Sequence, residues 1–96
     1  MDLVNLLKEN RAAILATAER HGARNVRIFG SVARGDFDDK SDLDFLVEME
    51  PGRSLLDHAS LLVALEELLG CKVDVVSEKG IKTRIRERVL KEARPL

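Results

Sequence analysis

Aspartate is concentrated between Gly30 and Glu48, in the stretch GSVARGDFDDKSDLDFLVE, and two of these aspartates have a spacing that suits chemistry. Asp42 and Asp44 lie two positions apart at the start of LDFLVEM, a segment whose apolar residues predict a β-strand. Side chains two positions apart on a strand point to the same face, roughly 7 Å from each other. Asp74 stands in the centre of another predicted strand, KVDVV. If the two strands are neighbours, three carboxylates converge on one patch.

Three carboxylates in strands that otherwise look buried need a partner. A buried carboxylate is costly unless it is paired or coordinates a metal, and carboxylates that share one patch repel each other. Hard divalent cations relieve this repulsion, and a Mg²⁺ ion held by only a few carboxylates keeps positions open for phosphate oxygens. The sequence therefore predicts a Mg²⁺ site at Asp42, Asp44 and Asp74.

The start of the same stretch has the residue types of a phosphate-binding turn. Gly30 ends the predicted strand NVRIFG, and Ser31 opens a predicted helical turn that extends to Arg34. Backbone N–H groups at such a turn form a concavity that binds anions, a serine hydroxyl adds a donor, and glycine lets a phosphate approach the backbone closely. Arg34 would add positive charge. A phosphate-binding turn beside a carboxylate metal site is what chemistry on a nucleoside triphosphate requires.

The rest of the chain predicts the elements that position these residues. Apolar residues at helical spacing run from Asp2 to about His21, and Ser54 is a suitable N-cap for a second long helix. The other expected elements are strands at 25–30, 43–49 and 72–76, a short helix at 31–34, and helices at 55–69 and 81–93. This order predicts a small α/β or α+β sheet covered by helices, in one domain that spans residues 1–96.

The spacing of these motifs resembles that of a known family. Gly30-Ser31 followed after ten residues by Asp42-Leu43-Asp44 is similar to the GS-x10-DxD signature of the DNA polymerase beta-like nucleotidyltransferase superfamily, and Asp74 resembles its third carboxylate. The short chain, the segment GSVARGD and the ending IRERVLKEARPL resemble the minimal nucleotidyltransferases over nearly the whole sequence. The resemblance implies the nucleotidyltransferase fold, in which helices flank a mixed sheet, and Mg²⁺-dependent transfer of a nucleoside monophosphate.

The resemblance also implies roles for six residues. Two Mg²⁺ ions would lie between the catalytic carboxylates, which are Asp42, Asp44 and Asp74. The phosphates of the nucleotide would contact Gly30, Ser31 and Arg34. No residue of the chain obviously recognises a base, so ATP as the substrate is an expectation that comes from the family alone.

Relatives of this size often act as antitoxins to HEPN-domain ribonuclease toxins, and some adenylylate a tyrosine of that partner. The resemblance therefore implies AMP transfer from ATP to a hydroxyl, such as that of a tyrosine, on a HEPN-family toxin. Two alternatives stay open: a non-catalytic antitoxin that neutralises its partner by binding, and nucleotidyl transfer to a small molecule. The complete carboxylate set argues against the first alternative. The shortness of the chain argues against the second, because small-molecule transferases usually carry an extra helical domain.

Other interpretations of the acidic stretch are simpler. We expect Asp36, Asp38 and Asp39 to be solvated turn residues whose side chains cap backbone groups. An EF-hand loop that starts at Asp36 fails at its fifth, sixth and twelfth positions, and the sequence contains no P-loop motif.

Composition excludes several other classes of function. The 16 basic and 17 acidic residues nearly cancel, which does not favour direct nucleic-acid binding. Cys71 is the only cysteine, and we expect it to be packed rather than reactive; the chain can form no intrachain disulfide and no cysteine-rich zinc cluster. His21 and His58 are more typical of surface or helix-end positions than of metal ligands. The chain has no apolar run typical of a signal peptide or a membrane span, so we expect a cytoplasmic protein.

Two helices carry features that the predicted site does not use. Residues 55–69, LLDHASLLVALEELL, are apolar around much of the helix, which predicts an exposed patch that meets another chain. The partner toxin is the expected occupant, a homo-oligomer stays open, and a helix wedged between the sheet and a neighbouring element is the alternative. In residues 81–93, Ile81, Ile85, Val89 and Ala93 mark an expected inner face, and basic residues form an outer ridge.

Overall fold

The centre of the protein is a four-stranded sheet in the order β3-β2-β1-β4, shown by a computed structural model that describes residues 2–38 and 40–96. The strands are β1 (Ala23–Phe29), β2 (Leu43–Met49), β3 (Val73–Ser77) and β4 (Arg94–Pro95). Strand β1 pairs antiparallel with β2 and β4, and β2 pairs parallel with β3. The sheet is therefore mixed, as the resemblance implied.

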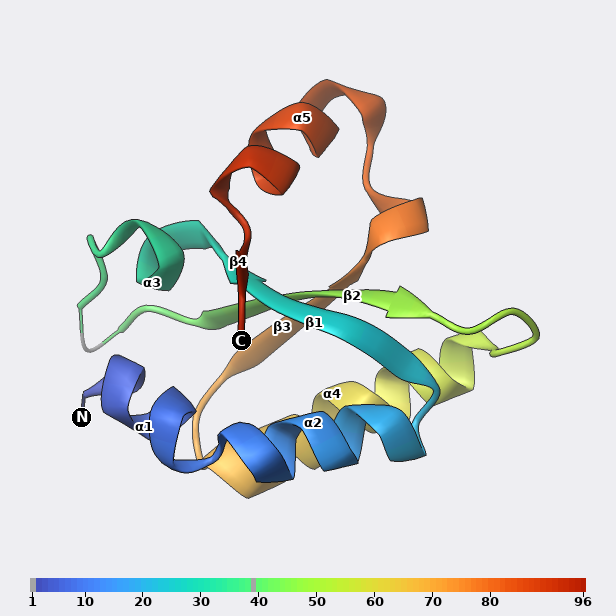
Figure 1. Ribbon diagram of the computed structural model, residues 1–96, viewed down its shortest axis with the longest axis horizontal. Helices are drawn as coiled ribbons and strands as arrows, with labels where there is room; N and C mark the ends of the chain where they lie inside the picture. The colour runs from blue at the N-terminus through green and yellow to red at the C-terminus, as the bar shows by residue number, and fades with distance from the viewer. Residues whose placement is uncertain (1, 39) are drawn as a thin grey trace.

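Helices cover both faces of this sheet (Figure 1). The helices are α1 (Leu3–Glu9), α2 (Arg11–Arg20), α3 (Gly30–Arg34), α4 (Leu55–Leu69) and α5 (Thr83–Glu92), with a 3-10 turn, η1, at Glu78–Gly80. Helices α1, α2 and α4 lie below the sheet in the view of Figure 1, and α3 and α5 lie above it. The predicted order of elements is confirmed, with β4 added at the end of the chain. None of the helices in the described residues is long and apolar enough to cross a bilayer.

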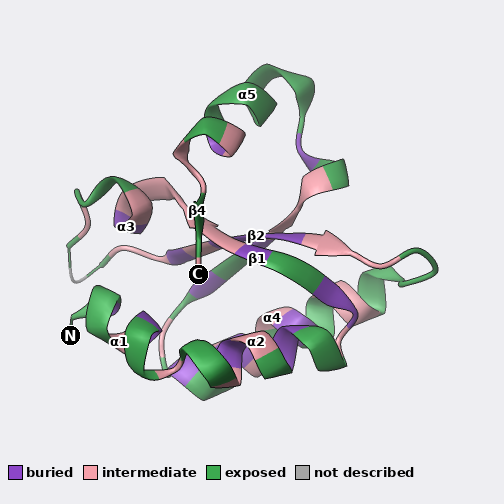
Figure 2. Ribbon diagram, viewed as in Figure 1, coloured by how far each residue is buried: buried purple, intermediate pink, exposed green. Residues whose placement is uncertain are grey.

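Two cores of unequal size hold the layers together, as the buried residues in Figure 2 indicate. The larger core joins α1, α2 and α4 to the sheet and includes the fully buried Ile14, Phe45 and Leu61. The smaller core joins the opposite face to the segment from η1 to α5 through Leu46, Ile81 and Val89. Each such side chain contributes about 1.5–3 kcal/mol on burial. Neighbouring strand residues face opposite ways, so Phe45 marks the face of β2 that packs on the larger core and Leu46 marks the face that packs on the smaller core.

Five elements differ in their bounds from the sequence prediction. Helix α3 begins one residue earlier, at Gly30, strand β3 lies one residue later, at Val73–Ser77, and the other three differ as follows. The first helix is interrupted at Asn10, whose side-chain amide donates to the Leu6 carbonyl at 2.9 Å and so competes with the helical backbone pattern. Strand β1 starts earlier and changes register between Arg24 and Arg27, where Asn25 takes a positive φ of 51°. The last helix begins at Thr83 rather than at residue 81, because η1 precedes it.

Both edges of the sheet are partly covered. On β3, the His58 ring Nε2 donates to the Val75 carbonyl at 2.7 Å, and the Val73 N–H donates to the Glu66 carboxylate at 3.3 Å. On the other side the short β4 pairs with β1 and contains Pro95, which has no N–H to offer. His58 is thus half-buried and tied to the sheet edge rather than free on the surface, whereas His21 is the C-cap of α2, as expected.

Candidate active site

Strand register brings two of the three predicted carboxylates side by side. Asp44 and Asp74 are register partners in the parallel pair β2–β3. Asp44 shares the α5 face of β2 with Leu46, because the residue between them, Phe45, belongs to the core on the other face. Asp42 comes two residues before Asp44, and its charge acts on the Asp44 carboxyl. The predicted proximity of the strands that carry these aspartates is confirmed.

The electrostatics of this patch are those of unpaired like charges. Burial raises the pKa of Asp44 to about 6, and the charges of Asp74 and Asp42 add to the rise, while Arg34 opposes it. Asp44 and Asp42 are half-buried and Asp74 is exposed. Among the described residues, none of the ion pairs includes any of these three aspartates. Within the ranges that the structure describes, the patch therefore concentrates negative charge that no basic side chain contacts.

The donor set suits a hard divalent cation, although it is not drawn together into a cluster. Within residues 2–38 and 40–96, no three His, Cys, Asp or Glu side chains lie close enough to hold a metal ion as they stand. Neighbouring carboxylates, one with a pKa raised by the others, are the oxygen ligands that Mg²⁺ prefers. Their binding of metal stays a prediction.

The Gly30–Ser31 turn lies directly beside Asp44. Phe29, the last residue of β1, is the register partner of Asp44, so the chain enters the turn next to that carboxylate. Gly30 has a φ of 75°, and a side chain there would collide with the Asp44 carboxylate. The Ser31 carbonyl accepts from the N–H groups of Gly35 at 2.9 Å and Asp36 at 3.0 Å, which fixes the turn. The two halves of the GS-x10-DxD pattern therefore meet in space.

Arg34 is committed to neighbouring acids. Its guanidinium contacts Asp36 at 3.2 Å and Glu92 of α5 at 3.2 Å, and these partners raise its pKa. It is close enough to lower the pKa of Asp44 but forms no contact with that carboxylate. To bind a phosphate, Arg34 would have to exchange an existing partner, whereas Gly30 and Ser31 would not.

A hollow beside Asp74 was not foreseen from the sequence. It has a volume of about 360 Å³ and lies between the sheet and the segment from η1 to α5, lined by Phe29, Asp74, Val76, Gly80, Ile81, Lys82, Ile85 and Val89. Ile85 was expected on the inner face of its helix, but it is 44% exposed and borders this hollow. One feature of the sequence could have indicated the hollow: the helix at 81–93 carries more apolar residues on one face than the smaller core buries.

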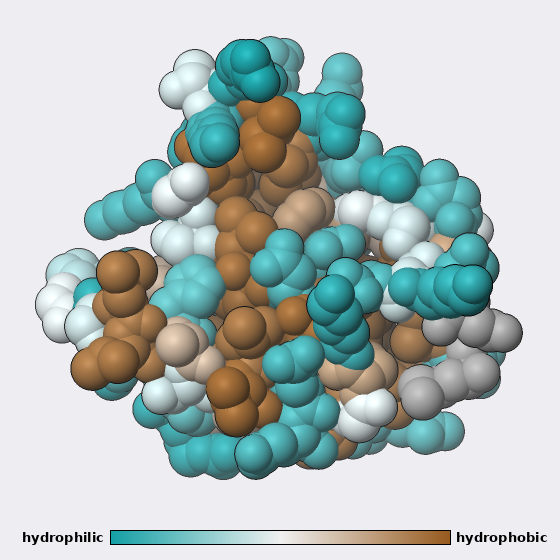
Figure 3. All heavy atoms as spheres, turned by 180° about the vertical axis from the view of Figure 1, so that it is seen from behind, coloured by the Kyte–Doolittle hydropathy of each residue, from teal (hydrophilic) through white to brown (hydrophobic). Residues whose placement is uncertain are grey.

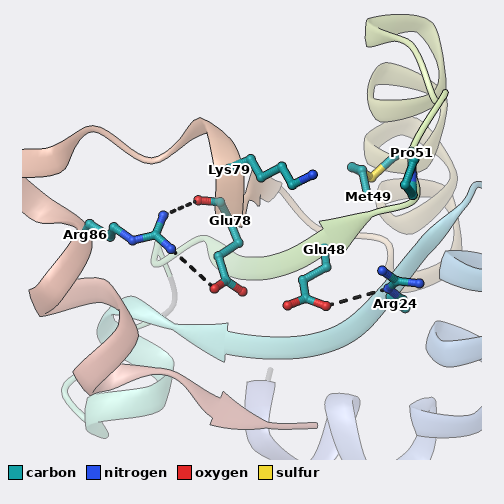
Figure 4. A pocket seen from close by; sticks show the side chains of 7 residues that line it. All are labelled: Arg24, Glu48, Met49, Pro51, Glu78, Lys79 and Arg86. Carbon is teal, nitrogen blue, oxygen red and sulfur yellow. Dashed lines mark hydrogen bonds and ion pairs between the residues drawn. The ribbon is translucent and has the colours of Figure 1, made fainter.

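A second hollow, of about 240 Å³, lies at the opposite end of the same sheet face (Figure 4). Its lining pairs acids with bases: Arg24 contacts Glu48 at 3.7 Å, and Arg86 contacts Glu78 at 3.6 Å. Arg27 contacts Glu78 at 2.6 Å behind them. The carboxylates of Glu48 and Glu78 are thus paired with arginines, unlike the aspartates near the first hollow. We therefore interpret this second hollow as part of the structural framework rather than as a binding site.

The remaining candidates are structural as well. Burial raises the pKa of the Cys71 thiol, which packs against the larger core, so it is not activated as a nucleophile. In the acidic loop, Asp38 accepts from the N–H of Lys40 at 2.9 Å, as expected for a turn residue. Asp36 is exposed, as expected, but its carboxylate pairs with the Arg34 guanidinium rather than with a backbone group. Asp39 lies outside the described residues.

Comparisons with known proteins point to one family. A sequence profile of the nucleotidyltransferase domain matches residues 11–96. The protein adenylyltransferase MntA of Thermococcus cleftensis is 43% identical over 74 residues, which cover 77% of this chain and 75% of MntA. MJ0435 of Methanocaldococcus jannaschii, provisionally named a protein adenylyltransferase, is 40% identical over 87 residues, which cover 91% of this chain and 94% of that protein.

Solved structures agree with these sequence relatives. A structure described provisionally as a minimal nucleotidyltransferase is 58% identical and superposes with a TM-score of 0.88, covering 100% of this chain and 97% of the other. A chain from a toxin–antitoxin crystal structure with AMP-PNP is 20% identical and superposes with a TM-score of 0.77, covering 90% of this chain and 71% of the other. At 20% identity, the likeness to this second structure shows the fold alone.

Proposed function

Because the chain belongs to the nucleotidyltransferase domain family, we propose that residues 1–96 form one minimal nucleotidyltransferase domain that transfers AMP from ATP to a hydroxyl of a partner protein. The observation that carries this proposal is the placement of unpaired Asp44 between Asp74 and the Gly30–Ser31 turn. A protein substrate is favoured because the relative MntA of Thermococcus cleftensis is named a protein adenylyltransferase.

The proposal gives each site residue a role. Asp42, Asp44 and Asp74 would hold Mg²⁺, which when bound would neutralise the triphosphate and lower the pKa of the acceptor hydroxyl. Gly30 has no side chain, which lets the turn approach the Asp44 carboxylate closely, and the Ser31 hydroxyl beside it would donate to a phosphate. Arg34 is a secondary phosphate ligand, because Asp36 and Glu92 already hold it.

The reaction is an in-line displacement at the α-phosphorus of ATP. The acceptor oxygen forms the new P–O bond, the bond from the α-phosphorus to its bridging oxygen breaks, and pyrophosphate leaves with that oxygen. Asp74 is the most exposed of the three carboxylates and accepts the hydroxyl proton. Catalysis of this kind depends mainly on positioning and on neutralisation of charge.

The hollow beside Asp74 is the proposed binding place for the nucleobase of the substrate. Its apolar lining includes the aromatic ring of Phe29 and the side chains of Val76 and Ile85, and it borders the carboxylate patch directly. A flat ring bound there would bury apolar surface without a specific hydrogen-bonding partner. We assign this hollow to the nucleobase; because its apolar lining would accept any flat ring, the choice of ATP rests on the relatives named adenylyltransferases.

The partner that we propose is a HEPN-family toxin, with this chain as its antitoxin. The toxin–antitoxin structure with AMP-PNP supports the pairing of this fold with a toxin and a nucleotide. A tyrosine is the proposed acceptor, because its phenol has a pKa near 10 and ionises more easily than an aliphatic hydroxyl.

Intact-protein mass spectrometry tests this function. The candidate toxin, mixed with the protein, ATP and Mg²⁺, should gain the mass of one or more AMP units. The variant Asp42→Asn should transfer no AMP, whereas Asp38→Asn, a change in the solvated loop, should transfer as the wild type does. A toxin that Asp42→Asn neutralises fully without any gain in mass would establish the non-catalytic alternative. Adenylylation of a small molecule, with no change in any protein, would contradict the proposed acceptor.

A further inference from the structure

Exposed apolar side chains are concentrated on one helix, α4. Of the six large hydrophobic residues exposed in the described chain, four lie on it: Leu55, Leu56, Val63 and Leu68. Leu56 is 78% exposed and Val63 is 52% exposed. Seen from behind, apolar atoms form a band from the top of the molecule to the bottom, with a further group at the left edge (Figure 3). Leu56 and Val63 line one groove on the helix, whereas Leu55 and Leu68 lie to either side of it by helical spacing. Isolated exposed leucines are ordinary, but apolar side chains that share a groove are typical of an interaction surface.

The exposed residues of α4 form an ordered face. The inner face carries Leu61, Leu65 and Leu69, all buried in the larger core. The side opposite to them carries residues spaced by four, three and four positions, which is the spacing of a helix–helix contact: Leu56, Ser60, Val63 and Glu67. With the flanking small residues Ala59 and Ala64 they line a shallow groove of about 380 Å³. Small side chains at the middle of a helix allow another helix to approach closely.

The charge of α4 selects among occupants. Residues 55–69 contain no Lys or Arg, and of their acids only Glu67 lines the groove. Asp57 is paired with Arg53 at 3.5 Å, and Glu66 accepts from the Val73 N–H at 3.3 Å. A second copy of this face would offer Glu67 no base, because none of the six residues that line the groove is a Lys, Arg or His. An apolar helix that carries a Lys or Arg would cover Leu56 and Val63 and also pair with Glu67.

The location of α4 separates this face from the catalytic patch. Helix α4 packs on the sheet face opposite to α5 (Figure 1), whereas Asp44 lies on the α5 side. A helix bound on α4 would therefore leave the hollow beside Asp74 uncovered. Binding through α4 and chemistry at the carboxylates can thus be tested independently.

We propose that the outer face of α4, formed by Leu56, Ala59, Ser60, Val63, Ala64 and Glu67, docks a positively charged amphipathic helix of the partner protein. The inference deepens the proposed function and rests on it for the identity of that partner, because it names the surface that holds the acceptor protein.

A synthetic peptide tests the surface itself. The probe is a fluorescein-labelled helical peptide with Leu at positions i, i+3, i+4 and i+7 and Lys elsewhere, and binding is followed by anisotropy in 0.15 M salt. Wild-type protein should bind it saturably. The double variant Leu56→Ser/Val63→Ser should bind at least about tenfold more weakly, because the face loses its two largest apolar contacts. Val4→Ser, an exposed change on α1, is the matched control and should bind as the wild type does.

The charge requirement is tested by a peptide with Glu in place of every Lys, which should not bind, and by Glu67→Lys, which should weaken binding of the Lys peptide. Equal binding by the double variant and the wild type would overturn the proposal. So would a wild-type dimer in sedimentation equilibrium that Leu56→Ser dissociates, since a second copy would then be the occupant.

The outcome can be told apart from a failure of the proposed function. Asp42→Asn should bind the Lys peptide normally, because the carboxylate patch lies across the sheet. If the double variant transfers AMP to the toxin with an unchanged KM for the toxin, the docking surface is wrong and the enzyme assignment stands. If no protein is adenylylated although the peptide results hold, the enzyme assignment fails and the surface remains.

Discussion

The two ends of one sheet face carry acidic residues in matching positions, but, in the described part of the chain, only the acids at one end are paired with arginines. On β2, Asp44 and Glu48 share this face four residues apart, and Asp74 and Glu78 stand in the same relation along the chain from β3 into η1. At the first end no ion pair within the described residues includes the aspartates. At the second end Arg24 contacts Glu48, and Glu78 contacts both Arg27 and Arg86.

The pKa values follow this difference. Burial and acidic neighbours raise the pKa of Asp44 to about 6, so its ionisation opposes folding. A hydrogen bond from Arg27, together with the charges of Arg27 and Arg86, lowers the pKa of Glu78, so its ionisation favours folding. The difference separates two kinds of acid in this fold: the carboxylate whose ionisation costs stability is the one to which we assign a ligand, and the carboxylates that pair with arginines stabilise the fold.

The largest expected effect is on Asp44. Asp44→Asn should reduce AMP transfer by at least about 100-fold, the scale seen when one electrostatic contact to the reacting group is removed. The same change should raise the free energy of unfolding by about 1–2 kcal/mol at pH 7 without metal, a value reduced for the partial exposure of the carboxyl. Activity assays and urea titrations measure the two effects. A variant that is both inactive and less stable would contradict the comparison.

The stability gain should depend on pH in a defined direction. In the unfolded chain the Asp44 carboxyl ionises near its ordinary pKa of 3.8, and in the folded chain it ionises only near pH 6. Between these values the folded state binds more protons, so wild-type stability falls as the pH rises. The advantage of Asp44→Asn should therefore be small near pH 4, grow up to about pH 6, and stay constant above.

The second effect concerns the close approach of the turn to Asp44. Gly30→Ala should destabilise the fold by about 2–3 kcal/mol, because it adds a strained positive φ and a collision with the Asp44 carboxylate. Gly35→Ala is the matched control: its φ is 83°, but a Cβ there meets nothing within 4 Å, so only the backbone strain of about 1 kcal/mol remains. Equal melting temperatures for the two variants would show that the Gly30 contact is unimportant.

The smallest effect is expected for Glu78, at the end of the sheet face where the acids are paired with arginines. Glu78→Gln should lower the free energy of unfolding by about 1 kcal/mol at pH 7, because it removes the charge from a hydrogen bond to Arg27, and AMP transfer should be unchanged. The sign of its pH dependence is opposite to that of Asp44. Glu78 has a lowered pKa, so its contribution is present above about pH 4.5 and is lost as the pH falls. Thermal melts across about pH 3–7 measure it, and a loss of activity would place Glu78 in the catalytic site instead.

Much of the arrangement around Asp44 and Asp74 could be predicted from the sequence, because it depends on local sequence patterns and on the register of one strand pair, β2 with β3. The strand at residues 43–49 and the helix at 55–69 have the bounds that were expected, and Ser54 forms the capping box with Asp57. Alternation along the strands then placed Asp44 on the same face as Leu46, and the parallel pairing of β2 with β3 placed Asp74 beside it.

The features that the sequence did not predict depend on contacts between distant segments. The pairing of Arg34 with Glu92 joins residues 58 positions apart, and no periodicity predicts it. The hollow beside Asp74 depends on how far α5 stands from the sheet, which η1 determines by delaying the start of the helix to Thr83. The interruption at Asn10 is local, but a side-chain amide that competes for a backbone carbonyl gives no signal in a hydrophobic pattern.

The partly covered edges of the sheet limit how this protein can associate with any other chain. His58 and Glu66 each bind one backbone group of β3, and the outermost strand on the other side is two residues long and contains Pro95, so a foreign strand finds only short runs of free backbone groups. Short and interrupted edges lower the risk of cross-β aggregation. Recognition then depends on side chains, which evolution can change one at a time without loss of the sheet.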